Sequence, residues 1–424
     1  MLELNLIRTK PDFVKERLKV KNFTQVELVD EIIVLDVERR KLQQVSEAAQ
    51  HESKSLSKEI PSLYKQGKRA EAEVLKSQAS SLKEKIKSSQ ETLKEIEAKL
   101  HDALIKLPNL PHESVPMGNG ADDNEVVKTH GEHPDLGEDA KPHWELFEQY
   151  NIVSLELGNK IAGAGFPVFI GKGARLQRAM INFFLEEAHK AGYEEYMLPL
   201  LVNEKSAYAT GQLPDKEGQM YHVGLDELYM IPTAEVPLTN VYRDVILKEG
   251  DFPVKLTGYT PCFRREAGSY GAHVRGLNRV HQFEKVEIVQ LTHPDKSYEA
   301  LEEMAKHVEG VLQKLGLPYR ILRLCGGDAT FTSALTYDFE TYSAAQKRWL
   351  EVSSVSNFET FQSNRMKLRF KDPETKKMRL AHTLNGSALA LARIVATVLE
   401  NNQTPEGIVV PEVLRKYTGF DIIN

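Results

Sequence analysis

The sequence predicts an α+β protein in two parts: a long antiparallel helical hairpin at the N-terminus, then a larger domain with an antiparallel sheet flanked by helices. Three observations predict this fold. Heptad repeats occupy residues 28–107, a segment rich in proline and glycine follows, and short β-rich runs alternate with helical periodicity from about residue 144. At 424 residues the chain can bury two sizeable cores. We therefore expect domains at 1–107 and 144–424 with a linker at 108–143.

The heptad repeats predict two helices that pack against each other. One seam runs from Leu28 to Leu63 and a second from Leu75 to Leu107, both with strict four-three spacing. A repeat that averages 3.5 residues places these side chains on one seam, which an isolated helix would expose to water. The connection at 64–68 is short enough to make the helices antiparallel. Each helix of about 35 residues would reach roughly 50 Å.

The predicted arm carries a local excess of positive charge. Residues 54–94 hold ten Lys or Arg and five acids, a difference of +5, on a chain whose formal net charge is -6. A projecting basic rod suits recognition of an RNA helix through its shape and phosphates. A spacer or an assembly handle is the alternative. The expected RNA contacts are Lys54, Lys58, Lys65, Lys68, Arg69 and Lys76.

Composition argues against several classes of protein. No apolar run approaches the ~18 to 20 residues of a membrane span, and the N-terminus lacks the pattern of a secretory signal. We therefore expect a cytoplasmic protein without membrane contact. Cys262 and Cys325 lie far apart, without CxxC spacing or histidines at ligand spacing, so we expect neither a disulfide framework nor a zinc site.

The segment richest in chemistry runs from Thr260 to Glu287, in a pattern typical of a strand, a glycine-containing loop and a second strand. The chain has neither a glycine-rich dinucleotide motif nor a P-loop, so a bound ATP would need fixed cations and a divalent metal. Arg264 suits a phosphate because its planar guanidinium can bridge two oxygens. Phe283 offers a face for adenine, and we expect the loop 267–276 to tighten on ATP.

This segment resembles motif 2 of class II aminoacyl-tRNA synthetases, in the form seen in bacterial-type seryl-tRNA synthetases. The resemblance extends to motif 3, to two further family signatures, and to motif 1, which builds the dimer interface in this class. With the N-terminal hairpin it covers essentially the whole chain. The matching stretches are 263–266 with 281–287 for motif 2, 383–393 for motif 3, 165–167 with the helix after Arg175 and 196–199 for motif 1, and 233–235 and 351–357 for the two signatures.

The resemblance implies an ATP site. Arg264 would hold the α-phosphate, Glu266 would accept the adenine amino group, and Phe283 and Arg393 would sandwich the base. Arg264, Glu266 and Arg393 are the expected catalytic residues, and Glu351 with Ser354 would ligate Mg²⁺. Arg265 replaces a small residue of many relatives, and its side chain should point away from the phosphates. The expected ATP-binding residues are Arg264, Arg265, Glu266, Val280, Phe283, Glu351, Val352, Ser353, Ser354 and Arg393.

The resemblance also implies a site for L-serine. Thr233 and Glu235 would bind the ammonium group, while Glu287 with Thr383 and Asn385 would recognise the hydroxyl. A buried acceptor for that hydroxyl discriminates against alanine and glycine without an editing domain. The expected serine-binding residues are Thr233, Ala234, Glu235, Arg264, Glu287, Thr383, Asn385 and Ser387.

The implied activity is the formation of seryl-adenylate from L-serine and ATP, then transfer of serine to tRNA(Ser), and to tRNA(Sec) where it exists, by a homodimer. Two rival hypotheses remain. A paralogue that loads a small amino acid onto a carrier protein would lack an arm of this kind. A non-catalytic RNA-binding protein on an inactive core would have lost Arg264, Glu266, Glu351 or Arg393, and all four are present.

Overall fold

A computed structural model describes residues 1–215, 217–266 and 274–424 of the chain. The expectation that the loop 267–276 tightens on ATP therefore falls largely outside the described residues. The chain forms two compact units. The first comprises residues 1–19 and 23–108, and the second comprises residues 20–22 and 109–424.

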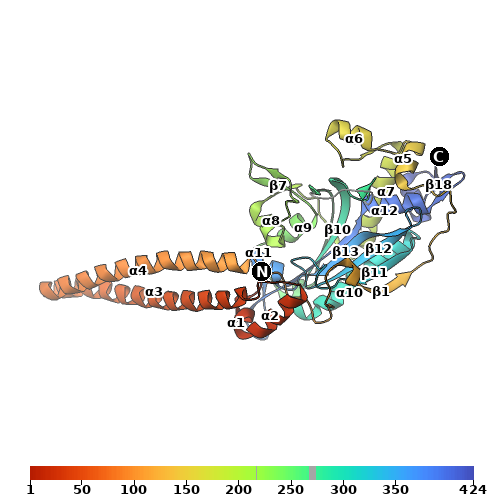
Figure 1. Ribbon diagram of the computed structural model, residues 1–424. Helices are drawn as coiled ribbons and strands as arrows, with labels where there is room; N and C mark the ends of the chain where they lie inside the picture. The colour runs from red at the N-terminus through yellow and green to blue at the C-terminus, as the bar shows by residue number, and fades with distance from the viewer. Residues whose placement is uncertain (216, 267–273) are drawn as a thin grey trace. The chain divides into compact units, whose positions relative to one another are not determined.

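The first unit is dominated by the predicted hairpin. Its helices are α1 (Leu4–Thr9), α2 (Pro11–Val20), α3 (Leu28–Lys65) and α4 (Arg69–Leu104). Helices α3 and α4 pack side by side along their length (Figure 1), and every predicted seam residue is buried or half-buried. The ten basic residues of 54–94 are all exposed. The antiparallel hairpin is thus confirmed.

The connection between the two long helices is shorter than predicted. It spans three residues, Gln66 to Lys68, because helical hydrogen bonds continue through the predicted turn residues 64 and 65. Gly67 has a φ of +80°, and the Lys68 N–H donates to the Leu63 carbonyl at 3.0 Å. Helices commonly end at a glycine in the left-handed region, with the N–H of the next residue donating to a carbonyl of the last helical turn. The turn therefore reverses the chain with little loop.

Asp36 ties the start of α3 to α1. Its carboxylate is buried and accepts hydrogen bonds from Arg8 Nε at 2.8 Å and Arg39 Nη2 at 2.9 Å. Burial alone would raise the pKa of Asp36, but the hydrogen bonds from Arg39 and Arg8 outweigh it and lower that pKa. The aspartate is thus held in its charged form at the base of the arm.

The second unit is built on one large sheet. Within the described residues it has eight strands, and neighbours are antiparallel except for the edge pair β4 and β9, which is parallel. The predicted antiparallel sheet is confirmed apart from that edge. Across the sheet the strands are β1 (Glu125–His130), β11 (Tyr319–Arg323), β12 (Leu335–Ser343), β13 (Arg348–Asn357), β16 (His382–Ala390), β10 (Gln282–Thr292), β9 (Val254–Phe263) and β4 (Glu194–Glu195).

Strand β1 lies inside residues 108–143, where the sequence predicts only a linker. Its six residues are all exposed, so they give no apolar alternation that would reveal a strand. The strand is held instead by backbone pairing with β11. An edge strand of this kind leaves little trace in the sequence.

Three helices cover one face of the large sheet: α7 (Gly171–Lys190), α10 (Ser297–Lys314) and α12 (Leu391–Asn401). Val286 and Ile288 of β10 belong to the core beneath them. Because side chains alternate along a strand, Phe283, Lys285 and Glu287 point to the opposite face. That face is therefore free to carry a site.

Shorter elements surround this core (Figure 1). The remaining helices are α5 (His143–Tyr150), α6 (Leu155–Ile161), α8 (Glu204–Thr210), α9 (Glu235–Asn240), α11 (Phe361–Met366) and α13 (Glu412–Thr418). The remaining strands are β2 (Val153–Ser154), β3 (Val168–Phe169), β5 (Leu201–Asn203), β6 (His222–Val223), β7 (Leu228–Met230), β8 (Ile246–Leu247), β14 (Arg369–Lys371), β15 (Met378–Leu380), β17 (Gln403–Thr404), β18 (Gly407–Val409) and β19 (Ile422–Ile423). Cys262 and Cys325 are buried free thiols. Among the described helices, none combines the length and apolar character needed to span a bilayer.

We predict that Asp36→Asn opens α1 and the first turns of α3. Losing the charged hydrogen bonds should lower the free energy of this opening by about 2 kcal/mol. Because the pKa of Asp36 is lowered, the stabilisation is complete above the ordinary aspartate value of about 3.9 and is lost as the pH falls below it. Amide hydrogen exchange of residues 4–9 measures the opening.

The control is Asp30→Asn on the same helix. Asp30 pairs with Lys15 at 2.7 Å, but 61% of its side chain is exposed. Exposed pairs contribute only about 0 to 1 kcal/mol, so exchange should hardly change. Equal effects of the two substitutions would contradict the role given to Asp36.

Candidate active site

A cavity of about 550 Å³ opens on the face of the sheet opposite α7, α10 and α12. This volume lies within the range of sites for small molecules. Its charged lining is balanced in sign, as expected of a site that binds both phosphates and an amino acid. The charged lining residues are Glu217, Glu235, Arg264, Glu266, Arg279, Lys285, Glu351 and Arg393.

Arg264 and Phe283 face each other across the paired strands β9 and β10. Arg264 follows β9 directly, and its Cζ atom lies 5.2 Å from the centre of the Phe283 ring. Its Nε donates to the Pro232 carbonyl at 3.3 Å, which leaves the Nη groups for a ligand within the cavity. The pair thus offers a cation for phosphate beside an aromatic face for a base.

The predicted residues that flank Arg264 differ in their positions. Glu266 lines the cavity and forms an ion pair with Arg279, a lining residue that the sequence analysis did not single out. Val280 is buried and also lines it. Arg265 is exposed and is not among the lining residues, so its predicted part in ATP binding has no support in the geometry of the cavity and stays a prediction.

A β-bulge in β13 brings Glu351 and Ser354 to the same side. Glu351 pairs with Glu340 and Ser353 with Phe339, so Val352 is an extra residue in the ladder. In a regular strand, residues three apart such as Glu351 and Ser354 point to opposite faces. The extra residue of the bulge shifts the alternation by one, so the two point to the same face. Glu351 and Ser354 accordingly share one face, and the cavity is lined by Glu351, Val352, Ser353 and Ser354.

The side-chain oxygens of Glu351 and Ser354 suit a hard cation such as Mg²⁺. The Ser354 hydroxyl donates to Asp338, which the sequence analysis did not name. Burial, with the charge of Glu351 next, raises the pKa of Asp338 well above its ordinary value. Among the described residues, no group of three or more His, Cys, Asp or Glu could hold a metal. Magnesium here would need phosphate oxygens as well.

Arg393, in the first turn of α12, reaches the cavity from the side of β13. Its Nε donates to the Asn278 carbonyl at 3.0 Å and its Nη1 to the Glu351 carbonyl at 2.8 Å. Nη1 also lies 3.3 Å from the Glu351 carboxylate. Backbone and carboxylate contacts therefore fix the plane of this guanidinium group.

A buried polar network around Glu287 lies directly behind the cavity and includes the lining residues Thr233 and Lys285. Thr233 Oγ1 donates to Glu287 Oε2 at 2.8 Å, and Lys285 Nζ donates to Thr233 Oγ1 at 2.8 Å and pairs with Glu287. Glu287 is 0% exposed and Lys285 is 5% exposed. A buried carboxylate needs such a partner, since an isolated buried charge is very costly.

Glu235 is the second buried carboxylate of this network. Asn385 Nδ2 donates to Glu235 Oε2 at 2.9 Å and, more weakly, to Glu287 Oε1 at 3.3 Å. Gln362 Nε2 donates to Glu235 Oε1 at 2.7 Å, and Thr383 Oγ1 donates to Gln362 Oε1 at 2.8 Å. Burial, assisted by the charge of Glu287, raises the pKa of Glu235 to about 7.

Not every residue predicted for serine binding reaches the cavity. Thr233, Glu235, Arg264, Asn385 and Ser387 line it, whereas Ala234, Glu287 and Thr383 are 0% exposed and do not. Ala234 packs in an apolar cluster, and the Thr383 hydroxyl is directed to Gln362, so these two can act only through their backbone or through neighbours. Glu287 lies directly behind the lining residues Thr233 and Lys285.

Two members of the buried network, Lys285 and Gln362, are not among the site residues that the sequence predicts. Lys285 stands two residues before Glu287 on the same strand, so the alternation of β10 could have revealed it. Gln362 comes from α11, and no local pattern connects it with Glu235. Only the tertiary fold reveals that contact.

The two units match two family profiles. Residues 1–111 match the family described as "Seryl-tRNA synthetase N-terminal domain". Residues 221–402 match the family described as "tRNA synthetase class II core domain (G, H, P, S and T)". The hairpin unit and the unit with the cavity thus each resemble the corresponding part of one group of enzymes.

Comparisons over the whole chain agree. A serine–tRNA ligase of Salinibacter ruber is 51% identical over 421 residues, covering 99% of this chain and 98% of its own. One from Thermotoga neapolitana is 44% identical over 425 residues and covers all of both chains. The crystal structure of seryl-tRNA synthetase from Pyrococcus horikoshii complexed with ATP has a TM-score of 0.92 and 32% identity, covering 100% of this chain and 99% of that one. The chain therefore belongs to the seryl-tRNA synthetase family of class II aminoacyl-tRNA synthetases.

Proposed function

We propose that this protein activates L-serine with ATP, forming seryl-adenylate and diphosphate, and then transfers serine to the 3′ end of tRNA(Ser). The observation that carries the proposal is the cavity in which buried carboxylates adjoin Arg264, Phe283 and Arg393. One end suits a small amino acid with an ammonium and a hydroxyl group. The other end suits a nucleotide.

In the activation step, the serine carboxylate attacks the α-phosphorus of ATP and diphosphate leaves. No protein nucleophile is needed once the reactants are aligned. Arg264 would hold the carboxylate and the α-phosphate together and neutralise the charge that develops at phosphorus. Phe283 and Arg393 would hold the adenine between them, and Glu266 would accept a hydrogen bond from the adenine amino group.

Mg²⁺, held by Glu351, Ser354 and the phosphates, would neutralise the diphosphate that leaves. The orientation of Ser354 is set by its hydrogen bond to Asp338. That Ser354 and Glu351 share a face because of the bulge at Val352 supports their joint role. The absence of zinc stays a prediction.

Selection of serine would rest on the two buried carboxylates. Glu235 would bind the ammonium group with Thr233, and Glu287 would accept from the hydroxyl beside Asn385. Alanine and glycine have no hydroxyl group, so they would leave Glu287 without a hydrogen-bond donor. An unpaired buried group of this kind discriminates against the wrong amino acid by a factor of order 10⁴ or more. Threonine would be excluded by size.

The proposed binding partners include tRNA, which the first unit would bind. The exposed basic residues of the hairpin would bind tRNA(Ser), and tRNA(Sec) in a cell that has it. We propose a cytoplasmic homodimer, supported by exposed apolar side chains on α6, among them Leu157 and Ile161. The domain boundaries at 107 and 143 stay proposals too.

The first prediction concerns amino-acid-dependent exchange between ATP and pyrophosphate. Exchange should occur with serine and not with alanine, glycine, threonine or cysteine. Arg264→Ala should lower its rate by about 10²- to 10³-fold, the usual loss for one group that stabilises transition-state charge. Glu287→Gln should lower the rate of serine-dependent exchange and leave the KM for ATP unchanged.

Exchange with glycine or alanine instead would favour the carrier-protein hypothesis. No exchange with any amino acid would favour the non-catalytic hypothesis.

The second prediction concerns pH. Because the pKa of Glu235 is raised to about 7, its carboxyl group is neutral below that pH and charged above it. Only the charged form pairs with the serine ammonium, so the KM for serine should fall as pH rises from 6 to 8. Below the pKa the slope should approach tenfold per pH unit.

Glu235→Gln is the control, since its side chain has nearly the same shape and does not titrate. This variant should bind serine weakly at every pH. A KM for serine that does not depend on pH in the unaltered protein would rule out the role given to Glu235.

The third prediction concerns the arm. Substituting alanine for Lys54, Lys58, Lys65, Lys68, Arg69 and Lys76 should raise the KM for tRNA in aminoacylation and leave serine-dependent exchange unchanged. The slope of log affinity against log salt should become shallower by up to ~0.9 for each phosphate that the arm no longer neutralises. Salt-dependent tRNA binding measures this slope.

Lys83, Lys85, Lys87 and Lys94 provide a matched control, because they are exposed lysines of the same arm. Their joint substitution by alanine should have a smaller effect. If it weakens tRNA binding more than the first set, the assignment of the contacts is wrong.

A further inference from the structure

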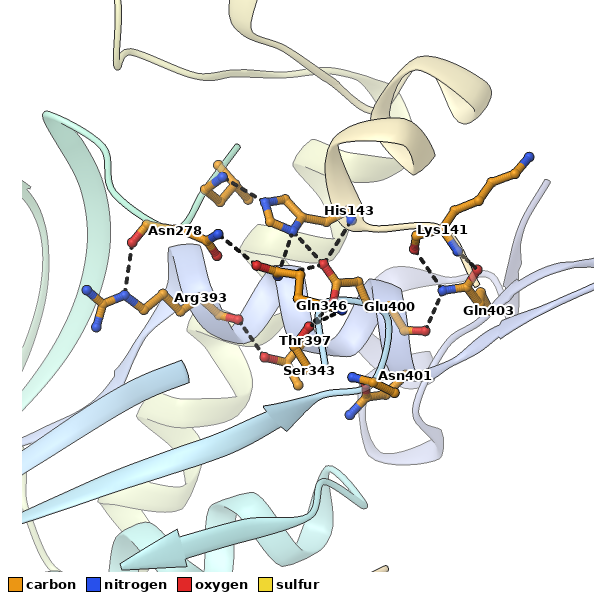
Figure 2. Close-up of polar contacts among 12 residues, drawn as sticks. Lys141, His143, Asn278, Ser343, Gln346, Arg393, Thr397, Glu400, Asn401 and Gln403 are labelled. Atoms are coloured by element: carbon orange, nitrogen blue, oxygen red, sulfur yellow. Dashed lines mark hydrogen bonds and ion pairs between the residues drawn. The ribbon is translucent and has the colours of Figure 1, made fainter. Parts of the chain in front are cut away.

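A buried histidine–glutamate pair, His143 and Glu400, joins α5 to α12 (Figure 2). His143 begins α5 and Glu400 lies near the end of α12, and both are 0% exposed. His143 Nδ1 lies 2.6 Å from Glu400 Oε1, which also accepts the His143 backbone N–H at 2.9 Å. Gln346 Nε2 donates to Glu400 at 2.9 Å, and the Ser343 hydroxyl donates to it as well. The carboxylate is thus fully partnered.

The hydrogen bonds assign one tautomer to His143. The backbone N–H of Leu277 donates to His143 Nε2 at 2.9 Å, so Nε2 must carry the lone pair. The ring proton is then on Nδ1 and is directed to Glu400. The imidazole therefore connects a fixed carboxylate to the backbone at Leu277.

The segment around Leu277 is shaped to fit this histidine. Gly276 has a φ of +70°, and a Cβ atom there would lie 2.1 Å from His143 Nε2, so no other residue allows so close an approach. The guanidinium of Arg275 lies 4.8 Å from the ring centre of Trp144, the next residue of α5. Residues 275–277 therefore rest on the first two residues of α5.

The same contacts continue to Arg393. Its Nε donates to the carbonyl of Asn278, whose side-chain Nδ2 donates to Gln346 Oε1 at 2.8 Å. Gln346 donates in turn to Glu400, so a closed ring runs through Glu400, His143, the backbone 277–278 and Gln346 (Figure 2). The Asn278 carbonyl is held by this ring and itself holds Arg393.

We propose that His143 is a positioning residue for ATP: with Glu400 and Gln346 it fixes residues 275–278, so that the Asn278 carbonyl sets the plane of the Arg393 guanidinium over the adenine. The inference rests on the proposed function of Arg393. A buried polar pair is weak evidence for stability, since apolar side chains of the same volume often serve as well. Its role here is to fix the position of residues 275–278, and through them Arg393, without touching the ligand.

The test compares His143→Ala and Gln346→Leu with the unaltered protein. Both should raise the KM for ATP in serine-dependent exchange by about 10- to 100-fold, the usual range for outer partners that orient a binding group. The KM for serine should stay unchanged. The amide of Leu277 should exchange its hydrogen faster in His143→Ala, and added imidazole should restore part of the activity by refilling the space.

His307→Ala is the matched control. This half-buried histidine lies on α10, and its Nε2 has no hydrogen-bond partner among the described residues. Removing it deletes the same side chain and should leave the KM for ATP unchanged.

A fall in thermal stability of His143→Ala and Gln346→Leu with an unchanged KM for ATP would overturn the proposal, because it would reduce the network to a structural role. If His143→Ala does not fold, Gln346→Leu decides alone, since it breaks the branch to Asn278 without emptying the core. Calorimetric ATP binding separates this inference from the proposed function. Should the unaltered protein fail to exchange with serine, weaker ATP binding by the variants would still support it, and equal binding would refute it.

Discussion

The register of β10 between β9 and β16 is the constraint on which the site depends. On one face of this strand Val286 and Ile288 belong to the main core. On the other face Phe283 and Lys285 supply an aromatic ring and a cation to the cavity, and the fully buried Glu287 lies beside the lining residues Lys285 and Thr233. A slip of one residue would exchange the two faces. The apolar core therefore also enforces the order of the polar groups.

The charges of the site depend on one another as much as on the ligand. Lys285 compensates Glu287, while Glu235 has amide donors in Gln362 and Asn385 but no direct cation among the described hydrogen bonds and ion pairs. Burial, with the charge of Glu287 next, accordingly raises the pKa of Glu235. With the proposed function, the free protein would hold this carboxyl group near its titration point at the place where the serine ammonium would bind, and the ammonium would supply the missing charge.

The sequence predicts the parts of this protein that repeat or that lie in short motifs. The heptad seam has regular spacing, and Arg264, Phe283 and Glu287 stand in one continuous pattern, so their position on paired strands could be expected. Features that depend on the register between strands could not be predicted from the sequence. The extra residue at Val352 has no signal in the sequence, and the contact between His143 and Leu277 joins segments 134 residues apart. Such contacts arise only when the sheet and its helices assemble.

The seam of the hairpin has a further mechanical consequence. Along its middle the buried seam positions are filled by small side chains, namely Ser46, Ala49, Ser53, Ala79 and Ser89, whereas Leu63 is buried next to the tip. Apolar burial contributes about 25 cal/mol per Å², so these positions store little stabilising free energy. Segments with few buried apolar contacts open and bend at lower cost than a dense core. The arm is therefore most compliant along its middle, between the buried apolar residues at its base and Leu63 near its tip.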